Sequence, residues 1–225
     1  MAQSNDPNYL DLFEFNRNWA DQYRRISKER MASARHPEIL YIGCCDNLIP
    51  VSELMGIDPT KVIIHRNIAN LVIAIDPNVM SVIHYAVDHL KVKRIIVCGH
   101  HNCGCIKTAM KPQDYGSLNS WLKSVRDVYR DHKDELNAIS DEVRRLDRLA
   151  ELSVLDQCQN AARIAVVQNN YIDSGYPTVH GWIFDPETGM LNDLNFDFKG
   201  TIDSVQQIYN LSSESFFDAE GDEVN

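Results

Sequence analysis

Two apolar runs in this chain each end at a glycine that is followed directly by cysteine or histidine. The first run, residues 39–42, leads into GCCD at 43–46, and the second, residues 94–98, leads into GHHNC at 99–103. Buried strands of a parallel sheet carry such near-continuous apolar runs, and their carboxyl ends lie at one edge of the sheet. The side chains after the two runs can therefore meet in space.

The rest of the chain alternates between strand and helix patterns. Further strands are expected at 62–66, 176–184 and 191–198, the last two joined by a hairpin at 186–189, and helices at 51–55, 78–90, 117–134 and 141–170. This alternation predicts an α/β fold with a mainly parallel central sheet flanked by helices.

The chain is expected to have three parts. Residues 1–36 form an N-terminal helical arm, since apolar side chains recur at helical spacing over 8–32, and the arm would pack on another subunit or on its own core. Residues 37–211 form the main domain. The acidic tail, 212–225, is expected to be disordered.

Composition excludes several classes of partner. The net charge of −10 disfavours nucleic acid and anionic membranes, which require clustered positive charge. We find no apolar stretch that could span a bilayer, and the polar N-terminus lacks the features of a signal peptide, so a cytoplasmic location is expected.

The six cysteines are not distributed as a disulfide framework. Five of them flank the two strand ends, which favours metal binding or core packing over bridging. Cys44, His100 and Cys103 together offer two thiolates and one imidazole, a set suited to zinc with one position left for water or a fourth side chain. A buried apolar thiol is the alternative interpretation of a single cysteine such as Cys44.

Several motifs in order resemble the β-class carbonic anhydrases, and most of all their bacterial and fungal members. The motifs are GCCDNLIP at 43–50, HRNIAN at 65–70, GHHNCG at 99–104 and VHGW at 179–182, and the similarity extends from about residue 38 to about residue 198. The resemblance implies a Zn²⁺ enzyme that interconverts carbon dioxide and bicarbonate. It also implies a homodimer or homotetramer with its active site at the dimer interface.

The resemblance also assigns roles to individual residues. Cys44, His100 and Cys103 match the zinc ligands of the family, and Asp46 matches its catalytic aspartate. In the family this aspartate either accepts a hydrogen bond from the zinc-bound hydroxide or becomes the fourth zinc ligand.

Leu48 departs from the family pattern, which has an arginine here that forms an ion pair with the aspartate. Leucine can neither carry charge nor form a hydrogen bond, so we predict that Asp46 binds the zinc as fourth ligand and closes the site. Two alternatives remain: Arg66 or Arg35 holds Asp46, or Asp46 exchanges with water and leaves weak activity. Cys105 is a second departure, because the family usually has glycine at this position.

A substrate or bicarbonate pocket is a further hypothesis. An alignment without gaps places Arg35 where relatives have a substrate-binding glutamine, so it would recruit bicarbonate or be an ordinary surface residue. Arg66 matches the arginine of a bicarbonate pocket in some members, and Tyr41 lies near one of its aromatic positions. The alternative for both is ordinary packing at the edge of the core.

Three functions are consistent with this sequence. The first is zinc-dependent hydration of carbon dioxide, weakened by Leu48. The second is a catalytically degenerate zinc-binding homologue that acts as a binding or scaffold subunit. The third, which rests on family analogy alone, is hydrolysis of a related small substrate such as carbon disulfide.

Overall fold

A computed structural model describes residues 11–20, 23 and 36–208 of the chain. Residues 1–36 and 37–225 form two separate compact units. In the first unit, residues 11–20 are helical. Arg35, most of the predicted arm and the acidic tail lie outside the described residues. Among the described helices, none combines the length and the apolar character needed to cross a membrane.

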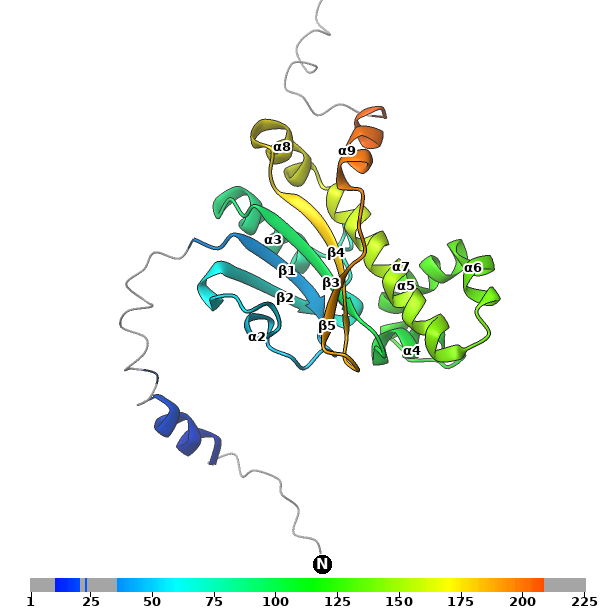
Figure 1. Cartoon of the computed structure of the whole chain (residues 1–225), viewed down its shortest axis with the longest axis horizontal. Helices are drawn as coiled ribbons and strands as arrows, with labels where there is room; N and C mark the ends of the chain where they lie inside the picture. Colours follow the sequence, from blue (N-terminus) through cyan, green and yellow to red (C-terminus); the bar gives the residue numbers. More distant parts are fainter. Residues whose placement is uncertain (1–10, 21–22, 24–35, 209–225) are drawn as a thin grey trace, which may run out of the picture. The chain divides into compact units, whose positions relative to one another are not determined.

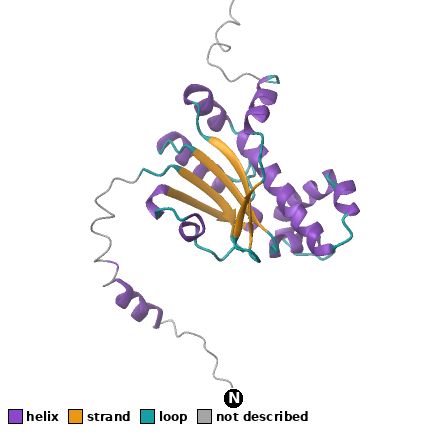
Figure 2. Ribbon diagram, in the orientation of Figure 1, coloured by secondary structure: helices purple, strands orange, loops and turns teal. Residues whose placement is uncertain are grey.

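A five-stranded sheet forms the centre of the second unit (Figure 2). Its order is β2 (Val62–Asn67), β1 (Ile39–Cys44), β3 (Arg94–His100), β4 (Thr178–Asp185) and β5 (Met190–Asp193). The first four strands are parallel, and β5 pairs antiparallel with β4. The predicted α/β fold with a mainly parallel sheet is therefore confirmed.

Helices flank this sheet, and α4, α5 and α6 gather on one side of it (Figure 1). In chain order the helices are α2 (Val51–Met55), α3 (Pro77–His84), α4 (Gly104–Met110), α5 (Leu118–Asp131), α6 (Lys133–Ala138), α7 (Glu142–Ala162), α8 (Ala165–Ser174) and α9 (Phe198–Gln206). Three further helical turns are η1 (Pro59–Lys61), η2 (Ile68–Asn70) and η3 (Tyr85–His89).

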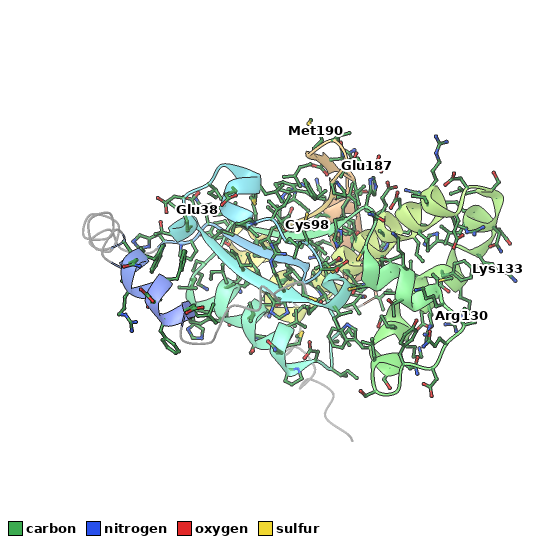
Figure 3. All side chains as sticks on the ribbon, turned by 90° about the horizontal axis from the view of Figure 1, so that it is seen from below. Glu38, Cys98, Arg130, Lys133, Glu187 and Met190 are labelled. Atoms are coloured by element: carbon green, nitrogen blue, oxygen red, sulfur yellow. The ribbon has the colours of Figure 1, made fainter. Side chains whose placement is uncertain are left out.

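Alternation along the strands divides the core into two clusters. Leu40, Ile42 and Cys44 of β1 belong to the larger cluster, which includes buried residues of α3, α5 and α7. Tyr41 and Cys98 belong to a smaller cluster that α2 covers. Figure 3 shows Cys98 near the centre of this unit, while Glu187 and Met190 mark the β4–β5 hairpin. The first cysteine of the GCCD motif thus faces the larger, helix-covered core.

Three expected elements differ from the structure. The single helix predicted at 141–170 is wrong, because Ile164 adopts an extended conformation and separates α7 from α8. The helix expected at 117–134 likewise ends at Asp131, before α6 begins at Lys133. The strand predicted at 191–198 ends at Asp193, since the Asp193 side chain accepts a hydrogen bond from the Asn195 N–H and Asn195 takes a left-handed conformation. Helices α4 and α9 were not predicted.

Candidate metal centre

The ends of two adjacent parallel strands bring three soft ligands together. Cys44 is the last residue of β1, His100 is the last residue of β3, and Cys103 directly precedes α4. Asn102, between His100 and Cys103, adopts a left-handed φ of 57°. Asparagine tolerates this conformation better than most residues, and it lets the chain turn back after β3. The ligand atoms of Cys44, His100 and Cys103 all lie within 4.8 Å of one another, and all three residues are buried.

The imidazole of His100 is oriented for metal binding. Its Nδ1 lies 3.0 Å from the carbonyl oxygen of His101. A carbonyl can only accept, so Nδ1 carries the proton, and in the neutral ring Nε2 presents a lone pair. Nε2 is buried and has no hydrogen-bond partner. A buried ring nitrogen without a partner, within reach of two thiols, is the arrangement expected of a zinc ligand.

The two thiols also fit zinc. The sulfur atoms of Cys44 and Cys103 lie 3.8 Å apart. Two thiolates bound at about 2.3 Å to one tetrahedral zinc ion stand about 3.8 Å from each other. These residues therefore fit zinc in residue type and in spacing.

Hydrogen bonds between the thiols favour a thiolate at Cys44. The pKa of the Cys44 thiol lies well below its usual range, because the sulfur atoms of Cys103 and Cys105 hydrogen-bond to it. Hydrogen bonds with the sulfur atoms of Cys105 and Cys44, together with burial, raise the pKa of Cys103.

A chain of contacts from α7 supports the metal loop. His101 Nε2 lies 2.9 Å from Glu151 Oε1. The other carboxylate oxygen of Glu151 accepts a hydrogen bond of 2.9 Å from Arg148. Because the His101 carbonyl in turn orients the His100 ring, Glu151 positions this ligand indirectly. The sequence carried no signal for this role, since residue 151 lies far along the chain in a helix.

Asp46 lies beside the three ligands and has a partner of its own. Its Oδ2 accepts a hydrogen bond of 2.7 Å from the backbone N–H of Gly104 and lies 3.9 Å from His100 Nε2. The side chain is 44% exposed. The predicted partners of this carboxylate were the metal, Arg66 and Arg35, and the peptide N–H was not among them.

Arg66 holds the loop that carries Asp46. Its guanidinium donates to the carbonyl oxygens of Cys44, Asn47 and Ile49 over 2.8, 2.6 and 2.8 Å. It also lies 5.9 Å from the centre of the Tyr41 ring. The guanidinium is thus directed at the loop backbone and not at the Asp46 carboxylate, which is a structural role that the sequence analysis did not foresee.

Comparisons with known proteins identify the family of this chain. A family profile described as carbonic anhydrase matches residues 39–191. A carbonic anhydrase of Emericella nidulans is 49% identical over 207 residues, which cover 91% of each chain. This chain belongs to the β-carbonic anhydrase family.

Solved structures of β-carbonic anhydrases show the same fold. One from Aspergillus fumigatus is 32% identical with a TM-score of 0.78, over 87% of this chain and 97% of that one. One of two tetrameric enzymes from Sordaria macrospora is 34% identical with a TM-score of 0.76, over 83% of this chain and 96% of that one. The family resemblance inferred from the motifs is therefore confirmed.

Within this carbonic anhydrase fold, the remaining predicted residues have different surroundings. Leu48 is 92% exposed, so a longer side chain would meet little obstruction there. Tyr41 is fully buried in the smaller core cluster. Arg35 lies outside the described residues. Cys105, the second departure from the family pattern, has its sulfur 3.7 Å from that of Cys44.

Proposed function

We propose that this chain catalyses the zinc-dependent hydration of carbon dioxide to bicarbonate, as a lyase. Cys44, His100 and Cys103 would hold the zinc ion. The observation that carries this proposal is the buried, unpartnered Nε2 of His100, which lies within 4.8 Å of both thiols. Membership of a family of carbonic anhydrases supports the reaction.

Zinc would activate the attacking water molecule, and residues of the chain would orient it. Bound zinc lowers the pKa of a water molecule toward about 7 and so supplies a nucleophile at neutral pH. Asp46 lies next to the ligands, and the Gly104 N–H fixes one of its oxygens. A carboxylate has about four lone-pair sites, so Asp46 can accept a further hydrogen bond and orient the attacking group.

Arg66 contributes through the backbone. By binding the carbonyls of Cys44, Asn47 and Ile49, its guanidinium fixes the loop that joins the first metal ligand to Asp46. Preorganised acceptors need no reorganisation at the moment of reaction. The predicted bicarbonate pocket at Arg66 and Tyr41 remains a hypothesis, as does a role for Arg35.

Self-association is part of the proposal. The Sordaria macrospora relatives are tetrameric, and we expect this chain to assemble as a dimer or tetramer as well. Sedimentation analysis of the purified full chain would measure the assembly directly, and a monomer at micromolar concentration would contradict it.

A pair of cysteine variants tests the site. Cys103→Ser removes a proposed ligand, whereas Cys158→Ala removes another buried thiol, which lies near Gly181. We expect zinc content and stopped-flow hydration of carbon dioxide to be lost together in Cys103→Ser and to persist in Cys158→Ala. Full zinc occupancy in Cys103→Ser would show that the ligand assignment is wrong.

A further inference from the structure

A third thiol lies in the metal centre. Cys105 is the second residue of α4 and is half-buried. Its sulfur is 3.7 Å from that of Cys44 and within 4.8 Å of that of Cys103. The inference drawn from this thiol rests on the proposed function, because it concerns the fourth ligand of the same zinc ion.

The spacing of the sulfur atoms suits a shared metal ion. Thiolates on one tetrahedral zinc stand about 3.8 Å apart, given a zinc–sulfur bond of about 2.3 Å. The Cys44–Cys103 distance is 3.8 Å and the Cys44–Cys105 distance is 3.7 Å. His100, which is 7% exposed, has an unpartnered Nε2 within 4.8 Å of the Cys44 and Cys103 sulfur atoms. Three sulfur atoms and one nitrogen would complete a closed tetrahedral site.

Asp46 is the competing fourth ligand, and its carboxylate already has a hydrogen-bond partner. Nitrogen and oxygen ligands bound at about 2.0–2.1 Å to tetrahedral zinc stand about 3.4 Å apart. Asp46 Oδ2 lies 3.9 Å from His100 Nε2 and accepts a 2.7 Å hydrogen bond from Gly104. The carboxylate would have to move toward the metal and strain or break this bond, whereas the Cys105 sulfur already lies at ligand spacing from Cys44.

We propose that Cys105 supplies the fourth ligand of a resting zinc site formed with Cys44, His100 and Cys103. The resting site is closed, and the Cys105 thiolate must leave for water to enter. Asp46 stays on the Gly104 N–H in this state. If hydration of carbon dioxide is slow, the Cys105 thiolate, which would keep water off the zinc, would then be as much the cause as the leucine at position 48.

The sulfur count around zinc tests this directly. Zinc-edge X-ray absorption would be measured on the full chain loaded with one zinc ion, for the wild type, Cys105→Ser and Cys45→Ser. Cys45 is the comparison variant, because it is the exposed thiol next to Cys44 and its sulfur also lies within 4.8 Å of those of Cys44 and Cys105. We expect three sulfur ligands in the wild type and in Cys45→Ser, and two in Cys105→Ser. Cys105→Ala serves if the serine variant folds poorly.

Each other outcome decides against the inference. An unchanged sulfur count in Cys105→Ser, or a loss in Cys45→Ser instead, would overturn it. A second zinc ion in the wild type that disappears in Cys105→Ser would do the same, since Asp46, Cys103 and Cys105 form another possible donor group, which shares Cys103 with the proposed site. A wild type that binds one zinc with two sulfur ligands overturns only this inference. A wild type that binds no zinc overturns the proposed function as well.

Discussion

The two halves of the candidate metal centre are built differently. Cys44, His100 and Cys103 come from the ends of buried, paired strands or the turn after them, and all three are buried. Asp46 and Leu48 lie on an exposed loop, which is held by the Arg66 side chain and one peptide N–H. The ligand half is therefore fixed by the sheet, whereas the loop half depends on a few polar contacts. A chain can keep the first half intact while the second diverges.

Removing a ligand should have the largest effect. In His100→Ala we expect zinc affinity to fall by more than about 100-fold, the upper end of what loss of a mere supporting group causes. The melting temperature should fall too, because metal binding contributes to folding free energy. Metal analysis and thermal unfolding measure both quantities. The exposed His84, changed to alanine, is the control, and zinc retained in His100→Ala would refute the ligand role.

Variants of Arg66 test whether its guanidinium holds the loop that carries Asp46 and Leu48. Arg66→Met removes three hydrogen bonds to backbone carbonyls, each from a charged donor. We expect the free energy of unfolding to fall by about 3 kcal/mol, since the site is only half-buried. Arg66→Lys should recover little of it, because lysine lacks the planar fork. Denaturant unfolding measures this, with the exposed Arg94→Met as control, and equal stability of Arg66→Met and wild type would contradict it.

Glu151 tests whether the ligand half depends on support from α7. Glu151→Gln weakens the contact with His101, whose carbonyl orients the His100 ring. We expect zinc affinity to fall by about tenfold, which is typical for outer-shell partners. Competition with a chelator measures the affinity. The control is Glu142→Gln at the start of the same helix, and an affinity change of equal size there would remove the special role of Glu151.

Leu48→Arg should produce the smallest change. An arginine at this exposed position could pair with Asp46, but exposed ion pairs contribute only up to about 1 kcal/mol. We expect kcat/KM for carbon dioxide hydration to rise by up to about fivefold. Leu48→Gln supplies a polar side chain without charge, and its kcat/KM should not rise above that of the wild type. If kcat/KM of Leu48→Arg does not rise either, the missing arginine is not the limiting defect.

The sequence predicted the ligand half of the site for a physical reason. Apolar runs that end in glycine define the strand ends, and parallel pairing then places Cys44 near His100 and Cys103. The same periodicity predicted the sheet, but it merged α7 with α8, because Ile164 is apolar and gives no local sign of a break.

The loop half could not be predicted in the same way. The partner of Asp46 is the backbone N–H of Gly104, and the partners of Arg66 are backbone carbonyls. Contacts to the backbone leave no pattern in residue types. The sulfur contact of Cys105 with Cys44 likewise depends on the direction in which α4 leaves the turn after Cys103.

The central claim is that zinc on the strand-end ligands catalyses the hydration of carbon dioxide. The most direct test is to titrate zinc into the metal-free protein and to follow stopped-flow hydration and bound metal in the same samples. We predict that the hydration rate rises with zinc and reaches its limit at one ion per chain. A chain that is fully loaded with zinc and hydrates carbon dioxide no faster than the metal-free protein would contradict the account.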